Sequence, residues 1–73
     1  MFKNVNPGEK SETYKDDERK NIIEITSGVG VLSLDGQAIN VKKGFILEIH
    51  IGSRFCLINT SKNNEVLKYI IFD

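Results

Sequence analysis

The chain has 73 residues, enough for one small domain with a thin hydrophobic core. Its ten Lys and Arg residues balance its ten Asp and Glu residues, which excludes the basic excess typical of nucleic-acid-binding proteins. The single cysteine excludes an intrachain disulfide, and no apolar run is long enough to cross a membrane. We see no basic-then-apolar leader pattern and expect no secretory signal. We therefore expect one cytoplasmic domain over residues 1–73, with neither a nucleic-acid nor a membrane partner.

The first twenty residues are polar and mixed in charge. The segment Asn6-Pro7-Gly8-Glu9 contains the only proline of the chain and is a turn signal. Residues 10–20 have an apolar period of neither 2 nor 3.6, so they match neither a strand nor a helix pattern. We expect a loop or an irregular edge strand in this part of the chain.

Short runs of β-branched residues, separated by turn residues, follow from residue 21 onward. The Asp35-Gly36 pair is a strong hairpin signal between two of these runs. The runs recur about every ten residues without any helix-length periodic segment, which predicts an all-β sandwich or barrel. Six strands are expected, over residues 21–25, 29–34, 37–41, 45–51, 55–58 and 66–72.

Alternation along these strands predicts which side chains face the core. In the run 45–51 the odd positions are apolar, whereas Glu48 and His50 fall on the opposite face. The inward residues are expected to be Ile23, Ile25, Ile39, Val41, Leu47, Ile49, Phe55 and Leu57.

Ile22, Cys56 and Ile58 alternate with the inward set and are expected to form one apolar outer patch. A nucleophilic role for Cys56 would need a neighbouring base, and the sequence supplies none, so we expect this thiol to pack against another surface. An apolar patch, a thin core and zero net charge together predict a homodimer.

The spacing of glycines and polar residues resembles the two sequence motifs of the cupin family. The second motif, G-x5-P-x-G-x2-H-x3-N, fits without gaps, with its defining positions on Gly44, His50, Gly52, Phe55 and Asn59. Three of those five positions carry the motif residue. The resemblance implies a small jelly-roll β-barrel made of two antiparallel sheets.

The first cupin motif, G-x5-H-x-H-x4-E-x6-G, also fits without gaps. Its positions fall on Gly8, Tyr14, Asp16, Asn21 and Gly28, and fifteen residues separate the last of these from the second motif. Among cupins, the order and length are most similar to the cupin half of mannose-6-phosphate isomerase-type proteins. That similarity implies carbohydrate or sugar-phosphate ligands.

In cupins, two histidines and a glutamate of the first motif and one histidine of the second hold a divalent metal in the barrel. Those positions carry Tyr14, Asp16, Asn21 and Phe55 here. Imidazole and carboxylate are the usual ligands of such metals, and a phenyl ring cannot ligate at all. We therefore expect neither a metal nor another cofactor, and we expect these four residues to line a ligand-binding cavity.

Three other features suggest chemistry. His50 is the only histidine and could act as an acid, a base or a ligand, but its alternation with Glu48 places it on the surface. Arg54 could hold a carboxylate or phosphate at the barrel mouth. The segment Asn59-Thr60-Ser61 matches the N-glycosylation pattern, which we attribute to chance because we expect no secretory signal.

Two function classes remain open. The first is a non-catalytic module, without a metal, that binds a small molecule such as a carbohydrate or sugar phosphate, or that mediates dimerisation. The second is a sugar isomerase or epimerase that works without a metal, through acid–base chemistry at Tyr14, Asp16 or His50. An apolar cavity filled by the phenyl ring would favour the first class. A roomy pocket in which Tyr14 and Asp16 converge would favour the second.

Overall fold

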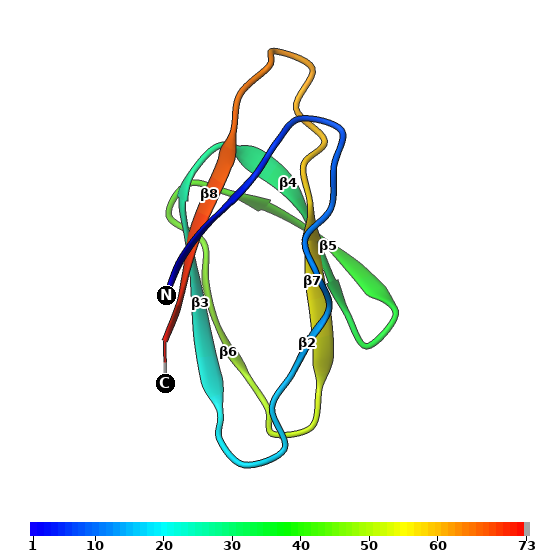
Figure 1. Cartoon of the computed structure of the whole chain (residues 1–73), viewed down its shortest axis with the longest axis vertical. Helices are drawn as coiled ribbons and strands as arrows, with labels where there is room; N and C mark the ends of the chain where they lie inside the picture. The colour runs from blue at the N-terminus through cyan, green and yellow to red at the C-terminus, as the bar shows by residue number, and fades with distance from the viewer. Residues whose placement is uncertain (73) are drawn as a thin grey trace.

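Eight strands form two four-stranded antiparallel sheets in the computed structural model, which describes residues 1–72 (Figure 1). One sheet has the strand order β1-β8-β3-β6 and the other has the order β2-β7-β4-β5. The strands are β1 (Phe2–Val5), β2 (Tyr14–Lys15), β3 (Asn21–Ser27), β4 (Val29–Leu34), β5 (Gln37–Lys42), β6 (Ile46–Ile49), β7 (Arg54–Ile58) and β8 (Leu67–Phe72).

The all-β prediction and the two antiparallel sheets are confirmed, but the sheets are not closed into a barrel. They face each other as two separate layers, each with its own pair of edge strands (Figure 1). The six expected strands are present with small shifts at their ends, and β2 is the irregular edge strand expected within residues 10–20. Strand β1 was not expected, because it lies in a polar stretch and pairs with β8, the most distant strand in the sequence. None of the described residues forms a helix that could span a membrane.

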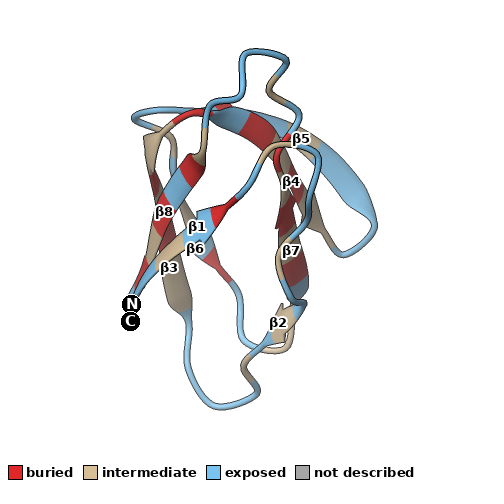
Figure 2. Ribbon diagram, turned by 45° about the horizontal axis from the view of Figure 1, so that its top comes forward, coloured by how far each residue is buried: buried red, intermediate tan, exposed pale blue. Residues whose placement is uncertain are grey.

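The core lies between the two sheets, where buried residues alternate with exposed ones along each strand (Figure 2). Of the eight residues predicted to face inward, six are buried, and Ile39 and Leu47 are half-buried against the core. Strands β1, β4 and β8 add residues that the pattern did not identify. The buried apolar residues are Val5, Ile23, Ile25, Leu32, Val41, Ile49, Phe55, Leu57, Leu67, Tyr69 and Ile71.

Two glycines near the crossing from one sheet to the other allow close backbone contacts: Gly28 lies between β3 and β4, and Gly30 lies within β4. Gly28 has a φ of +90°, and a Cβ there would lie 2.8 Å from the carbonyl oxygen of Val66. A Cβ on Gly30 would lie only 2.4 Å from the carbonyl oxygen of Ile58, on the neighbouring strand. The backbones therefore approach too closely at both points for any larger residue.

The outer patch expected from Ile22, Cys56 and Ile58 does not form. Ile22 lies on β3, in the sheet β1-β8-β3-β6, whereas Cys56 and Ile58 lie on β7, in the opposite sheet. Because all three residues point away from the core, they lie on opposite outer faces of the molecule. The alternation predicted their direction correctly but could not assign their strands to sheets.

Asn59 is a buried polar residue that ties three segments together. Its Nδ2 donates to the carbonyl oxygens of Val5 and Glu65, both at 2.8 Å, and its Oδ1 accepts from the backbone N–H of Ser61 at 2.8 Å. Only 1% of the residue is exposed. The side-chain nitrogen is therefore engaged and inaccessible, which agrees with a chance match to the glycosylation pattern.

Candidate functional site

A hollow of about 450 Å³ opens between the two sheets, next to the loop that joins β2 to β3. The four residues predicted to bind a ligand, Tyr14, Asp16, Asn21 and Phe55, all line it. They come from three separate parts of the chain: β2 and the loop after it, the first residue of β3, and β7. The remaining lining residues are Met1, Lys15, Asp17, Glu18 and Ile71.

The aromatic wall of the hollow is formed by Tyr14 and Phe55, which are direct partners in the β2–β7 pairing. Their rings are stacked, with centroids 5.1 Å apart and planes inclined by 22°. Phe55 is only 2% exposed, so it supports the wall from behind and offers little surface to a ligand. Tyr14 is half-buried and presents the accessible part of this pair.

The hydroxyl groups of Tyr14 and Tyr69 hydrogen-bond at 3.0 Å. Burial raises the pKa of the Tyr14 phenol well above its usual range, and the hydrogen bond with Tyr69 raises it further. Tyr14 therefore remains a neutral phenol throughout the physiological pH range.

Asp16 organises the loop between β2 and β3. Its Oδ1 accepts hydrogen bonds from the backbone N–H groups of Glu18 at 2.9 Å and Arg19 at 3.0 Å. Its Oδ2 accepts one from Nδ2 of Asn21 at 3.3 Å. The Glu18 and Arg19 amides hold the pKa of the Asp16 carboxyl below its usual range, with smaller contributions from Asn21 and the Arg19 charge. Asp16 is therefore an anion at neutral pH.

The rim of the hollow is acidic. The carboxylates of Asp16, Asp17 and Glu18 line it beside one lysine, Lys15. The lysine lies 3.4 Å from the carboxylate of Asp17. The N-terminal ammonium group belongs to Met1, another lining residue, and donates to the carbonyl oxygen of Ile71 at 2.9 Å. Both ammonium groups are thus already engaged. This arrangement repels an anionic ligand and tolerates a neutral one.

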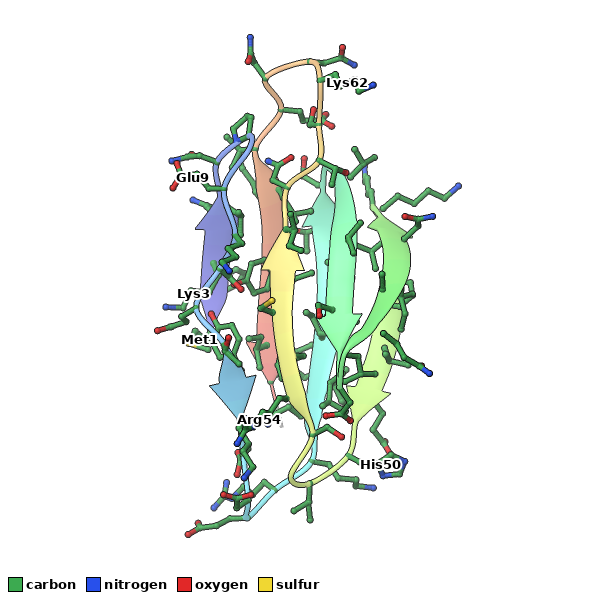
Figure 3. All side chains as sticks on the ribbon, turned by 90° about the vertical axis from the view of Figure 1, so that its right-hand side faces the viewer. Met1, Lys3, Glu9, His50, Arg54 and Lys62 are labelled. Carbon is green, nitrogen blue, oxygen red and sulfur yellow. The ribbon has the colours of Figure 1, made fainter. Side chains whose placement is uncertain are left out.

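The other candidate residues do not reach this hollow. His50 is exposed in the turn between β6 and β7, where its side chain points away from the sheets (Figure 3). Arg54 begins β7 and is exposed, but it is not part of the lining. Cys56 is half-buried on the outer face of β7, opposite Ser33 of β4.

Sequence reasoning missed Tyr69, which supplies the phenol that meets Tyr14. The alternation of Leu67, Tyr69 and Ile71 along β8 was a signal that could have placed this residue on the inner face, but the predicted inward set did not include it. Its contact with Tyr14 depends on how the two sheets face each other, which no local pattern encodes. Lys15, Asp17 and Glu18 were also missed, although their positions beside Asp16 in the sequence were a signal for them.

The four residues do not fit the divalent metal of the cupins. Tyr14 keeps its proton, Asn21 directs its amide nitrogen toward Asp16, and the Phe55 ring is packed against Tyr14. Asp16 alone offers an anionic ligand, and its oxygens already accept three hydrogen bonds. Within residues 1–72, no group of three or more His, Cys, Asp or Glu side chains is placed to hold a metal ion.

No family model and no curated protein matches the sequence. Among solved structures, a predicted oxalate decarboxylase from Thermotoga maritima has a TM-score of 0.85 and 23% identity, over 96% of this chain and 59% of the other. A cupin protein from Bacteroides fragilis has a TM-score of 0.84 and 18% identity, over 96% of this chain and 58% of that protein. A cupin-2 domain protein from Shewanella frigidimarina has a TM-score of 0.69 and 15% identity, over 97% of this chain and 67% of that protein.

The chain thus spans slightly less than 60% of the first two of these proteins. At such identities the likeness concerns the fold, and the specific similarity to mannose-6-phosphate isomerase-type proteins stays a prediction. Two facing antiparallel sheets, a polar hollow between them and these structural neighbours agree with one another. The chain therefore has the cupin fold.

Proposed function

We propose that this protein binds a neutral carbohydrate, or another polyol, in the hollow between its sheets, without a metal. The observation that carries the proposal is the convergence of Tyr14, Asp16 and Asn21 on a hollow of about 450 Å³. That volume lies within the range of small-molecule sites in proteins.

The chemistry of the three side chains suits hydroxyl groups. A sugar hydroxyl both donates and accepts hydrogen bonds, and the hollow offers an anionic acceptor at Asp16 and a neutral phenol at Tyr14. A carboxylate oxygen has room for more than one hydrogen bond, so the contacts of Asp16 within its loop do not exhaust it. The same loop contacts fix the carboxylate in place, which lowers the entropy lost on binding.

The charge of the rim favours a neutral ligand over a sugar phosphate. Three carboxylates face the hollow, and its one lysine is engaged by Asp17. Arg54, the residue that could have held a phosphate, lies outside the lining. A phosphate in this place would meet three carboxylates, against one lysine and the Met1 ammonium group, which are both engaged in other contacts.

A sugar isomerase or epimerase remains the second candidate, because Tyr14 and Asp16 do line one roomy pocket. Acid–base catalysis works best with groups whose pKa lies near the working pH. The pKa of Tyr14 is raised and that of Asp16 is lowered, so both move away from neutrality. His50 is exposed outside the hollow. These protonation states favour binding over catalysis.

The test is a titration of the ¹⁵N-labelled protein with neutral monosaccharides and with their phosphates, followed by NMR. We expect shifts of the amides of residues 14–21 with a neutral sugar and weaker shifts with its phosphate. Asp16→Asn and Tyr14→Phe should each reduce affinity about tenfold, the loss of roughly one hydrogen bond to a charged or polar group. Asp35→Asn is the matched control, because Asp35 also accepts a backbone N–H, from Arg54 at 2.8 Å, but lies outside the hollow.

Incubation of the same sugars with the protein in D₂O separates the two candidates. An isomerase or epimerase that removes a carbon-bound proton would place deuterium in the sugar, whereas a binding module would not. Deuterium incorporation that disappears in Tyr14→Phe would favour the enzyme. The absence of any sugar-dependent shift, with the Asp35→Asn control folded, would contradict the binding proposal.

A further inference from the structure

A second hollow, of about 730 Å³, is formed around the turn that joins β5 to β6. It is lined by residues of β4, of β5 and of this turn, together with Thr60, and none of them lines the first hollow. The two hollows lie toward opposite ends of β6. The turn precedes Ile46, whereas Gly52, just beyond the strand, donates its N–H to the carbonyl oxygen of Asp16 at 2.8 Å (Figure 1). The second hollow is therefore a separate candidate site.

The lining of the second hollow is partly apolar. Val29 of β4 is 42% exposed, and Phe45 of the turn is half-buried, with one part of its side chain packed against the core. Val41 of β5 also lines the hollow and is almost fully buried. The volume lies within the range of small-molecule sites. A ligand with an apolar body would remove this surface from water, which favours binding.

Two lysines give the second hollow a positive charge. Lys42 ends β5 and Lys43 begins the turn, and both are exposed and line the hollow. Neither ammonium group forms an ion pair within residues 1–72. None of the described residues that line it is an Asp or a Glu, whereas three carboxylates line the first hollow. The two hollows therefore favour ligands of different charge.

The turn that presents these side chains is held by the neighbouring backbone. The N–H of Lys43 donates to the carbonyl oxygen of Gly28 at 3.2 Å, and the N–H of Gly44 donates to that of Ile25 at 2.8 Å. The carbonyl oxygen of Phe45 accepts from the N–H of Ile25 at 2.9 Å. The backbone of the site is thus fixed before a ligand arrives, which limits the entropy lost on binding.

We propose that the second hollow binds a small amphipathic anion, a molecule with one carboxylate and a compact apolar body such as a phenyl ring. The carboxylate accepts charge-assisted hydrogen bonds from the ammonium groups of Lys42 and Lys43. The apolar body covers Val29 and Phe45, and an aromatic ring can stack against the phenyl group of Phe45. An inorganic anion gains only the first contact and a neutral apolar molecule only the second, so the hollow prefers a molecule that has both.

Titration of the ¹⁵N-labelled protein with 3-phenylpropionate, followed by NMR, tests this proposal. We expect saturable shifts of the amides of residues 40–45, with a dissociation constant of about 1 mM or below. Two probes serve as matched controls: 3-phenylpropanamide has the same ring and chain without the charge, and inorganic phosphate has charge without the ring. Each should bind at least about tenfold more weakly. The amides of residues 14–21 report on the first hollow and should not shift, so failure here and failure of the sugar proposal are distinguishable.

A double variant tests the role of the charge. Lys42→Gln with Lys43→Gln should weaken the binding of 3-phenylpropionate at least about tenfold and leave the weaker binding of the amide nearly unchanged. Lys10→Gln with Lys68→Gln is the matched control, because it removes the same total charge at two exposed lysines outside the lining. Neither of these lysines forms an ion pair within the part of the chain that the structure describes.

A single variant tests the role of the apolar wall. Val29→Ser should weaken the binding of both phenyl compounds about three- to tenfold, because it removes apolar contact area. Ile51→Ser is the control, since Ile51 is 52% exposed and lies outside this lining. All these substitutions are at exposed positions, and the amide spectrum of each variant reports whether it is folded.

Three results would overturn the proposal. The first is a folded wild-type protein whose residues 40–45 show no saturable shift with 3-phenylpropionate up to about 10 mM. The second is an unchanged affinity for 3-phenylpropionate in the double variant at Lys42 and Lys43. The third is inorganic phosphate binding as tightly as 3-phenylpropionate, which would mean that the lysines attract anions without help from the apolar wall.

Discussion

The hydroxyl oxygens of Tyr14 and Tyr69 lie 3.0 Å apart, one on each sheet of the structure. Tyr14 belongs to β2, at the edge of one sheet, and Tyr69 belongs to β8, inside the other. Their hydrogen bond therefore fixes the separation of the sheets where the hollow opens. It couples the stability of the fold to the shape of the candidate binding site.

Tyr14→Phe should lower the free energy of unfolding by about 1 kcal/mol at pH 7, the typical net value of one hydrogen bond. Urea denaturation measures this loss. Tyr69→Phe removes the other hydroxyl, and the two losses should not add in the double variant, because both delete the same bond. Additive losses in this cycle would show that the two hydroxyls act independently.

The same residue should make the protein sensitive to alkali. Because the folded-state pKa of Tyr14 is raised, its contribution to stability is fully present below the ordinary tyrosine pKa of about 10. It is lost as the pH rises above that value, since the unfolded chain ionises first. Denaturation at pH 9 and at pH 11 should show a fall in wild-type stability that is smaller in Tyr14→Phe.

Asp16 should have the opposite pH dependence. Its folded-state pKa is lowered, so its contribution is present above the unfolded value of about 3.9 and is lost as the pH falls through the folded value. Asp16→Asn should therefore show a shallower loss of stability between pH 6 and pH 2.5. Asp17→Asn is the control, because it makes the same change at the next residue of the loop, which contacts Lys15 at the surface, and leaves the hydrogen bonds of Asp16 in place.

Phe55→Ala should destabilise the fold by about 3–5 kcal/mol, the usual range for a buried phenylalanine. Since a domain of this size can have a total stability of only about 5 kcal/mol, the variant should be partly or largely unfolded at 25 °C. Phe2→Ala is the matched control, because that ring is 83% exposed, and its effect should stay below about 0.5 kcal/mol. A loss below about 1 kcal/mol for Phe55→Ala would contradict its place in the core.

Alternation and spacing predicted more of the fold than of the site. The inner face of each strand follows from a period of two, so residues such as Ile23 and Leu57 could be placed from the sequence. The first motif brought Tyr14, Asp16 and Asn21 into one set, and the structure places all three in one hollow. The sheet to which each strand belongs is a long-range property, which is why Ile22 and Cys56 were wrongly joined in one patch.

Asn59→Ala should cost about 2–4 kcal/mol, more than most single hydrogen-bond deletions. Removing the amide leaves the buried carbonyl oxygen of Val5 and the partly buried one of Glu65 without this donor, and the N–H of Ser61 without its acceptor. Asn63→Ala, in the exposed loop that follows, provides a control of the same residue type at a position whose φ is not positive. A loss below about 1 kcal/mol would show that water or the backbone replaces these contacts.

The correspondence with the cupin metal positions can be tested by restoring the ligands. The quadruple variant Tyr14→His, Asp16→His, Asn21→Glu and Phe55→His places three imidazoles and a carboxylate around the hollow that these positions line. Such a set suits zinc, nickel or manganese. We expect about one zinc per chain after dialysis, measured by elemental analysis, and a rise in melting temperature on adding zinc, because bound metal stabilises the folded state.

The triple variant that keeps Phe55 is the control for this experiment. It offers one imidazole fewer, and the phenyl ring still occupies part of the space, so its zinc affinity should be at least about tenfold weaker. The wild-type chain should retain no stoichiometric zinc under the same conditions. A folded quadruple variant without zinc would show that the four positions, although they line one hollow, do not converge closely enough to share a metal.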